Sequence, residues 1–150
     1  MVEKIVVTGA TSGLGRALVF ALANAGYQPV PTGRNAEKVA ALAHELGVVG
    51  YALDVSNSDE ISSVCAQMQR ELGPIDGLIN NAGIWLEGDF ETYSATQIKA
   101  VMDTNTTGTI LMTHALLPDM LARGQGTVIN TISTGALYSR KLISVYSASK

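Results

Sequence analysis

The chain has 150 residues, of which 47% are hydrophobic and 15% are charged, and its formal net charge is −3. This composition excludes a disordered chain and favours a folded domain with an apolar core. The acidic balance argues against nucleic-acid binding, which needs a basic face, and the apolar stretches are too short for a membrane span.

The chain begins directly with a strand-like run and shows no signal-peptide pattern. Its one cysteine, Cys65, excludes an internal disulfide, and His44 and His114 lack the spacing of a metal site. We therefore expect a protein of the reducing cytoplasm, with no metal and no membrane partner.

Strand-like and helix-like segments alternate along the whole chain. The predicted strands are residues 5–8, 28–32, 48–53, 77–80 and 127–132. The predicted helices are residues 14–25, 36–46, 58–72 and 96–123, and another begins near 145. Prolines at 29 and 31 weaken the second strand because each lacks a backbone donor. The stretch 96–123 reads either as one long helix or as two helices joined near Asn105.

Repeated strand–helix units predict an α/β fold, in which a doubly wound parallel sheet is flanked by helices, as in Rossmann-like domains. We expect residues 1–150 to form a single such domain. Ligands of these sheets bind beyond the carboxyl ends of the strands. Gly9, Asp54, Asn81 and Ser133 follow predicted strands, so they should converge on one crevice.

A glycine-rich turn joins the first strand to the first helix, with glycines at 9, 13 and 15. Glycine permits tight turning there and lets backbone N–H groups approach a pyrophosphate at the helix N-terminus. The spacing differs from Gly-x-Gly-x-x-Gly, so a loop that merely needs glycine is the alternative reading of this turn.

Arg34 lies about twenty residues past the glycines, where an acidic residue would bind the ribose of NAD and an arginine would suit the 2′-phosphate of NADP. Because no carboxylate occurs between the glycine turn and Glu37, we predict NADP as the cofactor, with NAD possible. A solvated arginine that opens a surface helix is the alternative.

Tyr146 and Lys150 are four residues apart, a spacing that places both on one face of a helix. An ammonium one turn away favours the phenolate electrostatically, which suits a proton donor and acceptor. Such pairs are also common as surface neighbours. Ser133, just after an apolar strand-like run, strengthens the chemical reading.

Together these residues resemble the short-chain dehydrogenase/reductase family, specifically its common oxidoreductase subfamily. Residues 8–15 (TGATSGLG) resemble the cofactor motif of that family, and residues 80–83 (NNAG) resemble its Asn-Asn-Ala-Gly motif. The residues in the positions of its catalytic four are Asn105, Ser133, Tyr146 and Lys150. The resemblance covers the whole chain.

The resemblance implies an NADP(H)-dependent oxidoreductase that interconverts a small-molecule carbonyl and an alcohol, in a dimer or tetramer. It makes Tyr146 the general acid or base, Ser133 a hydrogen-bond donor to the substrate, Lys150 the partner of Tyr146 and of the ribose, and Asn105 the residue that keeps a helix kink and a water of the proton relay. The implied cofactor-binding residues are Gly9, Thr11, Ser12, Gly13, Leu14, Gly15, Arg34, Asp54, Val55, Asn81, Ala82, Gly83, Tyr146 and Lys150.

Members of this family continue past the position of Lys150 with further strands, so we expect this chain to be an N-terminal part of a longer domain. The alternative is a non-catalytic nucleotide-binding module or an inactive truncated product. Trp85, just after the Asn-Asn-Ala-Gly segment, either faces the substrate or packs internally.

Overall fold

Five parallel strands form the centre of the computed structural model, which describes residues 2–138 and 140–150. The strands are β1 (Lys4–Val7), β2 (Gln28–Gly33), β3 (Tyr51–Ala52), β4 (Gly77–Asn80) and β5 (Thr127–Asn130). Their order in the sheet is β3-β2-β1-β4-β5, so the chain adds strands first on one side of β1 and then on the other. This is the predicted doubly wound α/β fold. A ligand site is expected at the carboxyl edge where the order reverses.

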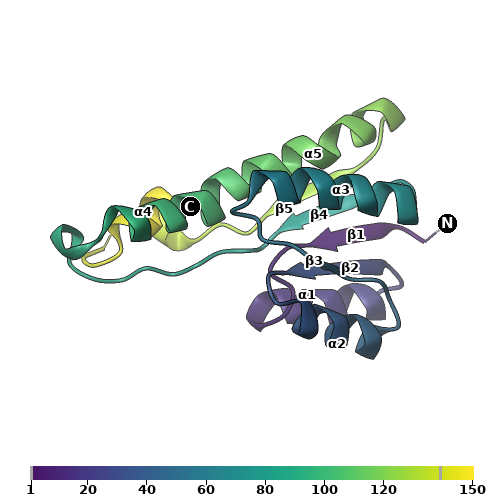
Figure 1. Cartoon of the computed structure of the whole chain (residues 1–150), viewed down its shortest axis with the longest axis horizontal. Helices are drawn as coiled ribbons and strands as arrows, with labels where there is room; N and C mark the ends of the chain where they lie inside the picture. The colour runs from purple at the N-terminus through teal and green to yellow at the C-terminus, as the bar shows by residue number, and fades with distance from the viewer. Residues whose placement is uncertain (1, 139) are drawn as a thin grey trace.

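Helices cover both faces of this sheet (Figure 1), with α1 and α2 on one face and α3 and α5 on the other. The helices are α1 (Gly13–Asn24), α2 (Ala36–Leu46), α3 (Ser58–Leu72), α4 (Ala95–Met102), α5 (Gly108–Arg123) and α6 (Ser144–Ala148). The predicted bounds of the second and third helices are confirmed. The Asn57 side chain caps α3 by accepting from the backbone N–H groups of Asp59 and Glu60.

The core divides into two clusters because side chains alternate across a strand. Ile5 and Val7 of β1 face α1 and α2, where they join Val19 and Leu42 in one buried cluster. Val6 faces the other way, into a larger cluster with α3 and α5. That cluster includes Leu53, Ile61, Met68, Leu78, Met112 and Leu116. Full burial of one such side chain contributes about 1.5–3 kcal/mol, so both faces anchor the sheet.

The third strand is much shorter than predicted, because only Tyr51 and Ala52 of the expected range 48–53 pair with β2. The prolines of β2 explain the difference. The N–H of Gln28 donates to Glu3 on the β1 side, so by alternation Pro29 and Pro31 face the β3 side, where each lacks the donor that a longer β3 would need. Pairing with β3 therefore begins at Thr32.

The predicted stretch 96–123 is helical throughout but changes its winding near the middle. A π-helical segment, η2 (Asp103–Thr107), joins α4 to α5 and contains Asn105. The stretch begins at a capping box formed by Ser94 and Gln97. It ends at Gly124, whose φ of 68° gives a left-handed cap. The reading of two helices joined near Asn105 describes this arrangement.

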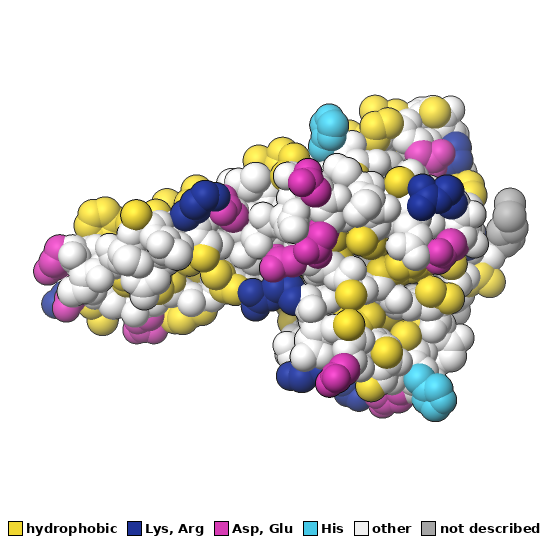
Figure 2. Space-filling model, in the orientation of Figure 1, with side chains coloured by type: hydrophobic (Ala, Val, Ile, Leu, Met, Phe, Trp, Pro, Cys, Tyr) yellow, Lys and Arg dark blue, Asp and Glu magenta, His cyan; other side chains and the backbone are white. Residues whose placement is uncertain are grey.

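An arm extends beyond the carboxyl ends of the strands and carries α4 and α6 (Figure 1). The short 3₁₀ helices η1 (Phe90–Thr92) and η3 (Thr134–Ala136) complete the described elements of this region. Figure 2 shows the outline of the molecule hollowed between the arm and the lobe of α1 and α2, with basic side chains at the edge of the hollow. Within the described residues, no helix is long and apolar enough to cross a membrane.

Candidate functional site

The turn between β1 and α1 follows a path that favours glycine. Gly9 and Gly13 have φ values of 63° and 51°, in the left-handed region. A Cβ at Gly13 would meet no atom within 4 Å, and Gly13 lines a cavity at this edge of the sheet. Gly13 therefore leaves room for a ligand to approach the backbone at the start of α1.

Gly15 serves packing instead. A Cβ at this position would overlap the carbonyl oxygen of Gly9 and would lie 2.6 Å from the Asn81 side-chain nitrogen. Because glycine has only a hydrogen atom at this position, α1 can begin in direct contact with the turn and with the segment that follows β4. The turn thus needs glycine for two reasons: at Gly13 it leaves the backbone open to a ligand, and at Gly15 it allows close packing.

The segment after β4 is fastened to this turn by a hydrogen-bond network. The buried Thr8 hydroxyl accepts from the backbone N–H groups of Asn81 and Ala82, each at 3.0 Å. The Asn81 side-chain amide donates to the carbonyl oxygens of Thr8 and Gly9 at 3.0 and 3.3 Å. The amide of Asn81 therefore braces the turn at the wall of the cavity.

A cavity of about 460 Å³ lies at the reversal of strand order, between the glycine turn, the end of β2 and the segment after β4. Among the predicted cofactor residues, those that line it are Gly9, Thr11, Ser12, Gly13, Leu14, Gly15, Arg34, Val55, Asn81, Ala82 and Gly83. Its volume is in the range of small-molecule and cofactor sites, about 300–1,000 Å³. Of the four strand-end residues predicted to converge on one crevice, Gly9 and Asn81 line this cavity, whereas Asp54 and Ser133 do not.

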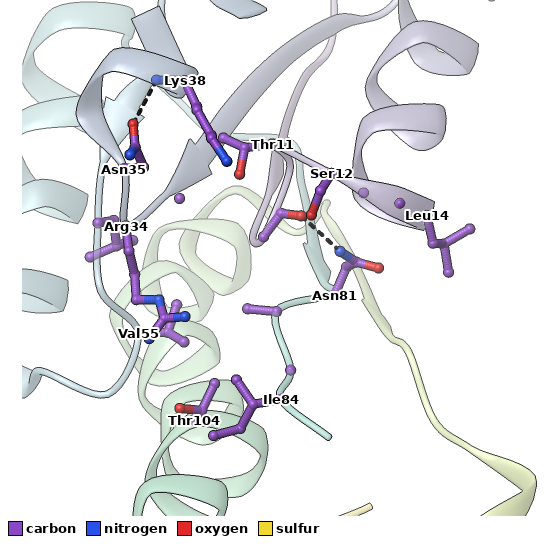
Figure 3. Close-up of a pocket in the computed structure, with 17 residues that line it drawn as sticks. Thr11, Ser12, Leu14, Arg34, Asn35, Lys38, Val55, Asn81, Ile84 and Thr104 are labelled. Carbon is purple, nitrogen blue, oxygen red and sulfur yellow. Dashed lines mark hydrogen bonds between the residues drawn. The ribbon is translucent and has the colours of Figure 1, made fainter. Parts of the chain in front are cut away.

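Two basic side chains line the same cavity near β2. In Figure 3, Lys38 extends toward Thr11, whereas Arg34 extends toward Val55. Asn35 caps α2 by accepting from the backbone N–H of Lys38 at 2.8 Å. Sequence reasoning identified Arg34 but missed Lys38, although its place one turn into α2 after a capping asparagine was a readable signal.

Three predicted cofactor residues lie outside this cavity lining, namely Asp54, Tyr146 and Lys150. The Asp54 carboxylate accepts from the backbone N–H and the hydroxyl of Ser56, at 2.9 and 2.7 Å. Its own backbone N–H donates to Glu60 at 3.0 Å. Asp54 thus shapes the turn before α3, while its neighbours Leu53 and Val55 line the cavity.

Asn105 is buried in the π-helical segment and connects three parts of the arm. Its side chain accepts from the backbone N–H of Ile84 at 2.8 Å and donates to the carbonyl of Ile84 at 3.0 Å. It also donates to the Ser149 hydroxyl at 2.9 Å, just past the end of α6. All these bonds satisfy a buried amide, so Asn105 sets the position of residue 84 relative to α6.

Lys150 reaches from the end of α6 back toward the sheet. Its ammonium donates to the carbonyl of Thr131 at 3.3 Å and would lie 3.1 Å from a Cβ placed at Gly83. Burial lowers the pKa of Lys150 from its usual value, because the charged form loses solvent. The structure thus brings Lys150 to the segment of residues 81–84, whose Ala82, Gly83 and Ile84 line the cavity.

A second cavity, of about 410 Å³, lies in the arm. Its lining consists of Trp85, Ser133, Thr134, Gly135, Tyr138, Arg140 and Ile143. Trp85 lies against the Tyr146 ring, with the ring centroids 4.4 Å apart. Gly135 lies close to two hydroxyl groups. A Cβ at this position would lie 3.3 Å from the Ser133 hydroxyl and 3.6 Å from the Ser147 hydroxyl.

The structure therefore brings Ser133, Tyr146, Lys150 and Asn105 together in the arm, beside the cavity that the glycine turn lines. Sequence reasoning missed Tyr138 and Arg140, which lie in a stretch without a recognisable motif. Within residues 2–138 and 140–150, no group of three or more His, Cys, Asp or Glu side chains could hold a metal. Cys65 is buried in the core, and burial raises the pKa of its thiol to about 11.

The family model described as short chain dehydrogenase matches residues 3–150, so the chain belongs to this family. A ketoacyl reductase, HetN of Nostoc sp., is 36% identical over 99% of this chain and 53% of its own length. The crystal structure of a short-chain dehydrogenase from Streptomyces avermitilis superposes with a TM-score of 0.96 at 34% identity, covering 100% of this chain and 56% of that one.

The closed form of serine dehydrogenase complexed with NADP⁺ gives a TM-score of 0.94 at 34% identity, covering 99% of this chain and 61% of its own. The chain thus spans between about half and two thirds of these relatives. The predicted membership of the short-chain dehydrogenase family is confirmed.

Substitution of two glycines should separate packing from ligand approach. We expect Gly15→Ala to lower the free energy of unfolding by several kcal/mol, because its Cβ would overlap backbone that cannot move aside. Gly13→Ala should cost only about 1–2 kcal/mol, the strain of an L-residue at positive φ. Urea denaturation of both variants measures the difference, and equal losses would contradict the packing role of Gly15.

Proposed function

We propose that this protein is an NADP(H)-dependent oxidoreductase that interconverts a small-molecule carbonyl and an alcohol. The observation that carries the proposal is the meeting of two features at the carboxyl edge of the sheet. A cavity with a glycine turn and two basic side chains lies beside a cluster of Ser133, Tyr146 and Lys150. The glycine turn and the proton-transfer groups thus lie next to each other.

The residues of the first cavity fit a dinucleotide. The backbone at Gly13 is open to the cavity at the N-terminus of α1, where N–H groups and the helix dipole favour a phosphate. Arg34 and Lys38 supply positive charge for a further phosphate at the ribose end. The similar serine dehydrogenase structure is described as complexed with NADP⁺, which supports NADP for this chain.

Each member of the second cluster has a role that its contacts allow. The bound nicotinamide would supply or accept a hydride. Tyr146 would give a proton to the carbonyl oxygen in reduction and take it back in alcohol oxidation. The Ser133 hydroxyl accepts from the N–H of Gly135 at 3.1 Å, an arrangement that leaves its own hydrogen available for the substrate oxygen.

Lys150 and Asn105 would support this proton transfer. Thr131 occupies one of the three donor positions of the Lys150 ammonium, so two remain for the ribose hydroxyls and for Tyr146. Asn105 would hold the arm in register, because its amide joins Ile84 to Ser149 beside Lys150. Asp54 would act through its turn, which presents Val55 to the cavity.

The cofactor preference can be tested through charge. We expect tighter binding of NADPH than of NADH, and Arg34→Asp with Lys38→Ala should weaken NADPH binding about ten- to a hundredfold, the loss typical of charge-assisted phosphate contacts. Fluorescence titration of both cofactors measures this. Arg16→Ala is the matched control, since Arg16 pairs with Glu45 and lies outside the cavity lining. Equal or tighter binding of NADH to the unaltered protein would contradict the preference.

The proton donor can be tested by removing one oxygen. Tyr146→Phe keeps a ring against Trp85 but removes the acid, so turnover of ketones or aldehydes with NADPH should fall by at least about a hundredfold. Cofactor affinity should stay unchanged. Tyr27→Phe, at an exposed position between α1 and β2, is the control. Retained turnover in Tyr146→Phe would refute the assignment, whereas cofactor binding without any turnover in the unaltered protein would favour a nucleotide-binding module.

We also propose that the active form is a homo-oligomer, a dimer or a tetramer. The helix α5 buries one face against α3 and the sheet but leaves Ile110 and Leu121 exposed at 61% and 70%. Exposed apolar positions along one helix are typical of an interface. Sedimentation equilibrium should show an oligomer that dissociates in Ile110→Glu/Leu121→Glu, while Val49→Glu, away from α5, should not change its mass. A monomeric active protein would exclude this proposal.

A further inference from the structure

The second cavity carries a charge that the proposed reaction does not use. Trp85 and Tyr138 give it aromatic walls, Ser133 gives it a hydroxyl, and within the described part of the chain Arg140 is the one charged residue of its lining. Arg140 is exposed to solvent, so its guanidinium keeps its charge without a large desolvation cost and can meet a ligand that enters this cavity.

The guanidinium of Arg140 is positioned over the Trp85 ring, with its carbon 5.7 Å from the ring centroid. The ion pairs formed among the described residues do not include Arg140. The Glu87 carboxylate accepts from the Trp85 indole nitrogen at 3.0 Å. The planar donor fork of Arg140 is therefore available for a bidentate bond to a carboxylate.

Trp85 relates this charge to the proposed acid. The same indole that lies under Arg140 also contacts the Tyr146 ring at a centroid distance of 4.4 Å. A molecule in the second cavity can therefore place one end at Arg140 and the other near Tyr146 and Ser133. A small molecule that carries both an anionic group and a carbonyl could meet the cation and the hydroxyl of this lining together.

The dinucleotide does not account for Arg140. The first cavity has its own basic pair in Arg34 and Lys38, and the linings of the two cavities share no residue. Ile84 lines the first cavity, and its chain neighbour Trp85 lines the second. The charge of Arg140 thus belongs to the ligand of the second cavity.

We propose that the second cavity binds a carbonyl substrate that bears a carboxylate, an oxo acid, and that Arg140 determines this specificity. The inference rests on the proposed reductase function. In it, Arg140 holds the carboxylate, Trp85 and Tyr138 flank the carbon chain, and Ser133 meets the carbonyl oxygen.

The test compares an oxo acid with its uncharged ester, using acetoacetate and methyl acetoacetate as probes. The protein should show a higher kcat/KM for the acid, measured by NADPH oxidation. Arg140→Ala should lower the ratio of acid to ester kcat/KM about ten- to a hundredfold, as loss of a charge-assisted hydrogen bond does. Arg140→Lys should restore part of the ratio. Lys141→Ala is the matched control, because it removes a neighbouring charge from outside the cavity lining.

The outcomes separate this inference from the function on which it rests. Turnover of both probes with no preference for the acid, or an equal loss on both in Arg140→Ala, would overturn the role of Arg140 and leave the reductase function standing. A weaker affinity of Arg140→Ala for NADPH, with the acid-to-ester ratio unchanged, would assign the residue to the cofactor instead. No NADPH oxidation with any carbonyl compound would overturn the proposed function and this inference together.

Discussion

The geometry of the whole site depends on the junction between β1 and β4. These neighbouring strands end side by side, and the chain continues from β1 into α1 and from β4 into the arm (Figure 1). The buried Thr8 hydroxyl and the Asn81 amide join the two exits through four hydrogen bonds. At about 1 kcal/mol each, these bonds hold the glycine turn and residues 81–84 at a fixed separation, and the cavity is the space that they leave.

Most apolar contacts between the helices of the arm and the core are made by α5. The orientation of the arm therefore needs additional polar contacts. Asn105 supplies them from a π-helical turn, a winding that occurs often at functional sites. The extra residue of such a turn rotates the helix after it, so α5 can pack on the sheet while α4 contacts α6. From within this turn, the buried Asn105 amide bonds to both Ile84 and Ser149.

Much of this architecture follows from patterns that are local in sequence. Alternating strand and helix periods predict the fold, and capping residues such as Asn57 fix helix starts because their bonds span only a few residues. The shortness of β3 was missed because it depends on which neighbour Pro29 and Pro31 face, a question of sheet order rather than of composition. Tyr138 and Arg140 were missed for a similar reason, since their place at a cavity follows from tertiary packing.

The overall charge of the protein must also be distinguished from the charge at its cavities. The chain carries a net charge of −3, which opposes the approach of an anion, and salt screens this long-range field beyond about 8 Å at physiological ionic strength. On the face in Figure 2, acidic and basic side chains are interspersed, so that face presents no single-sign field. Selection for an anionic ligand must therefore act at contact distance, in the cavities themselves. Arg34 and Lys38 line one cavity and Arg140 lines the other, so discrimination between anions would depend on where each cation sits and not on the charge of the protein.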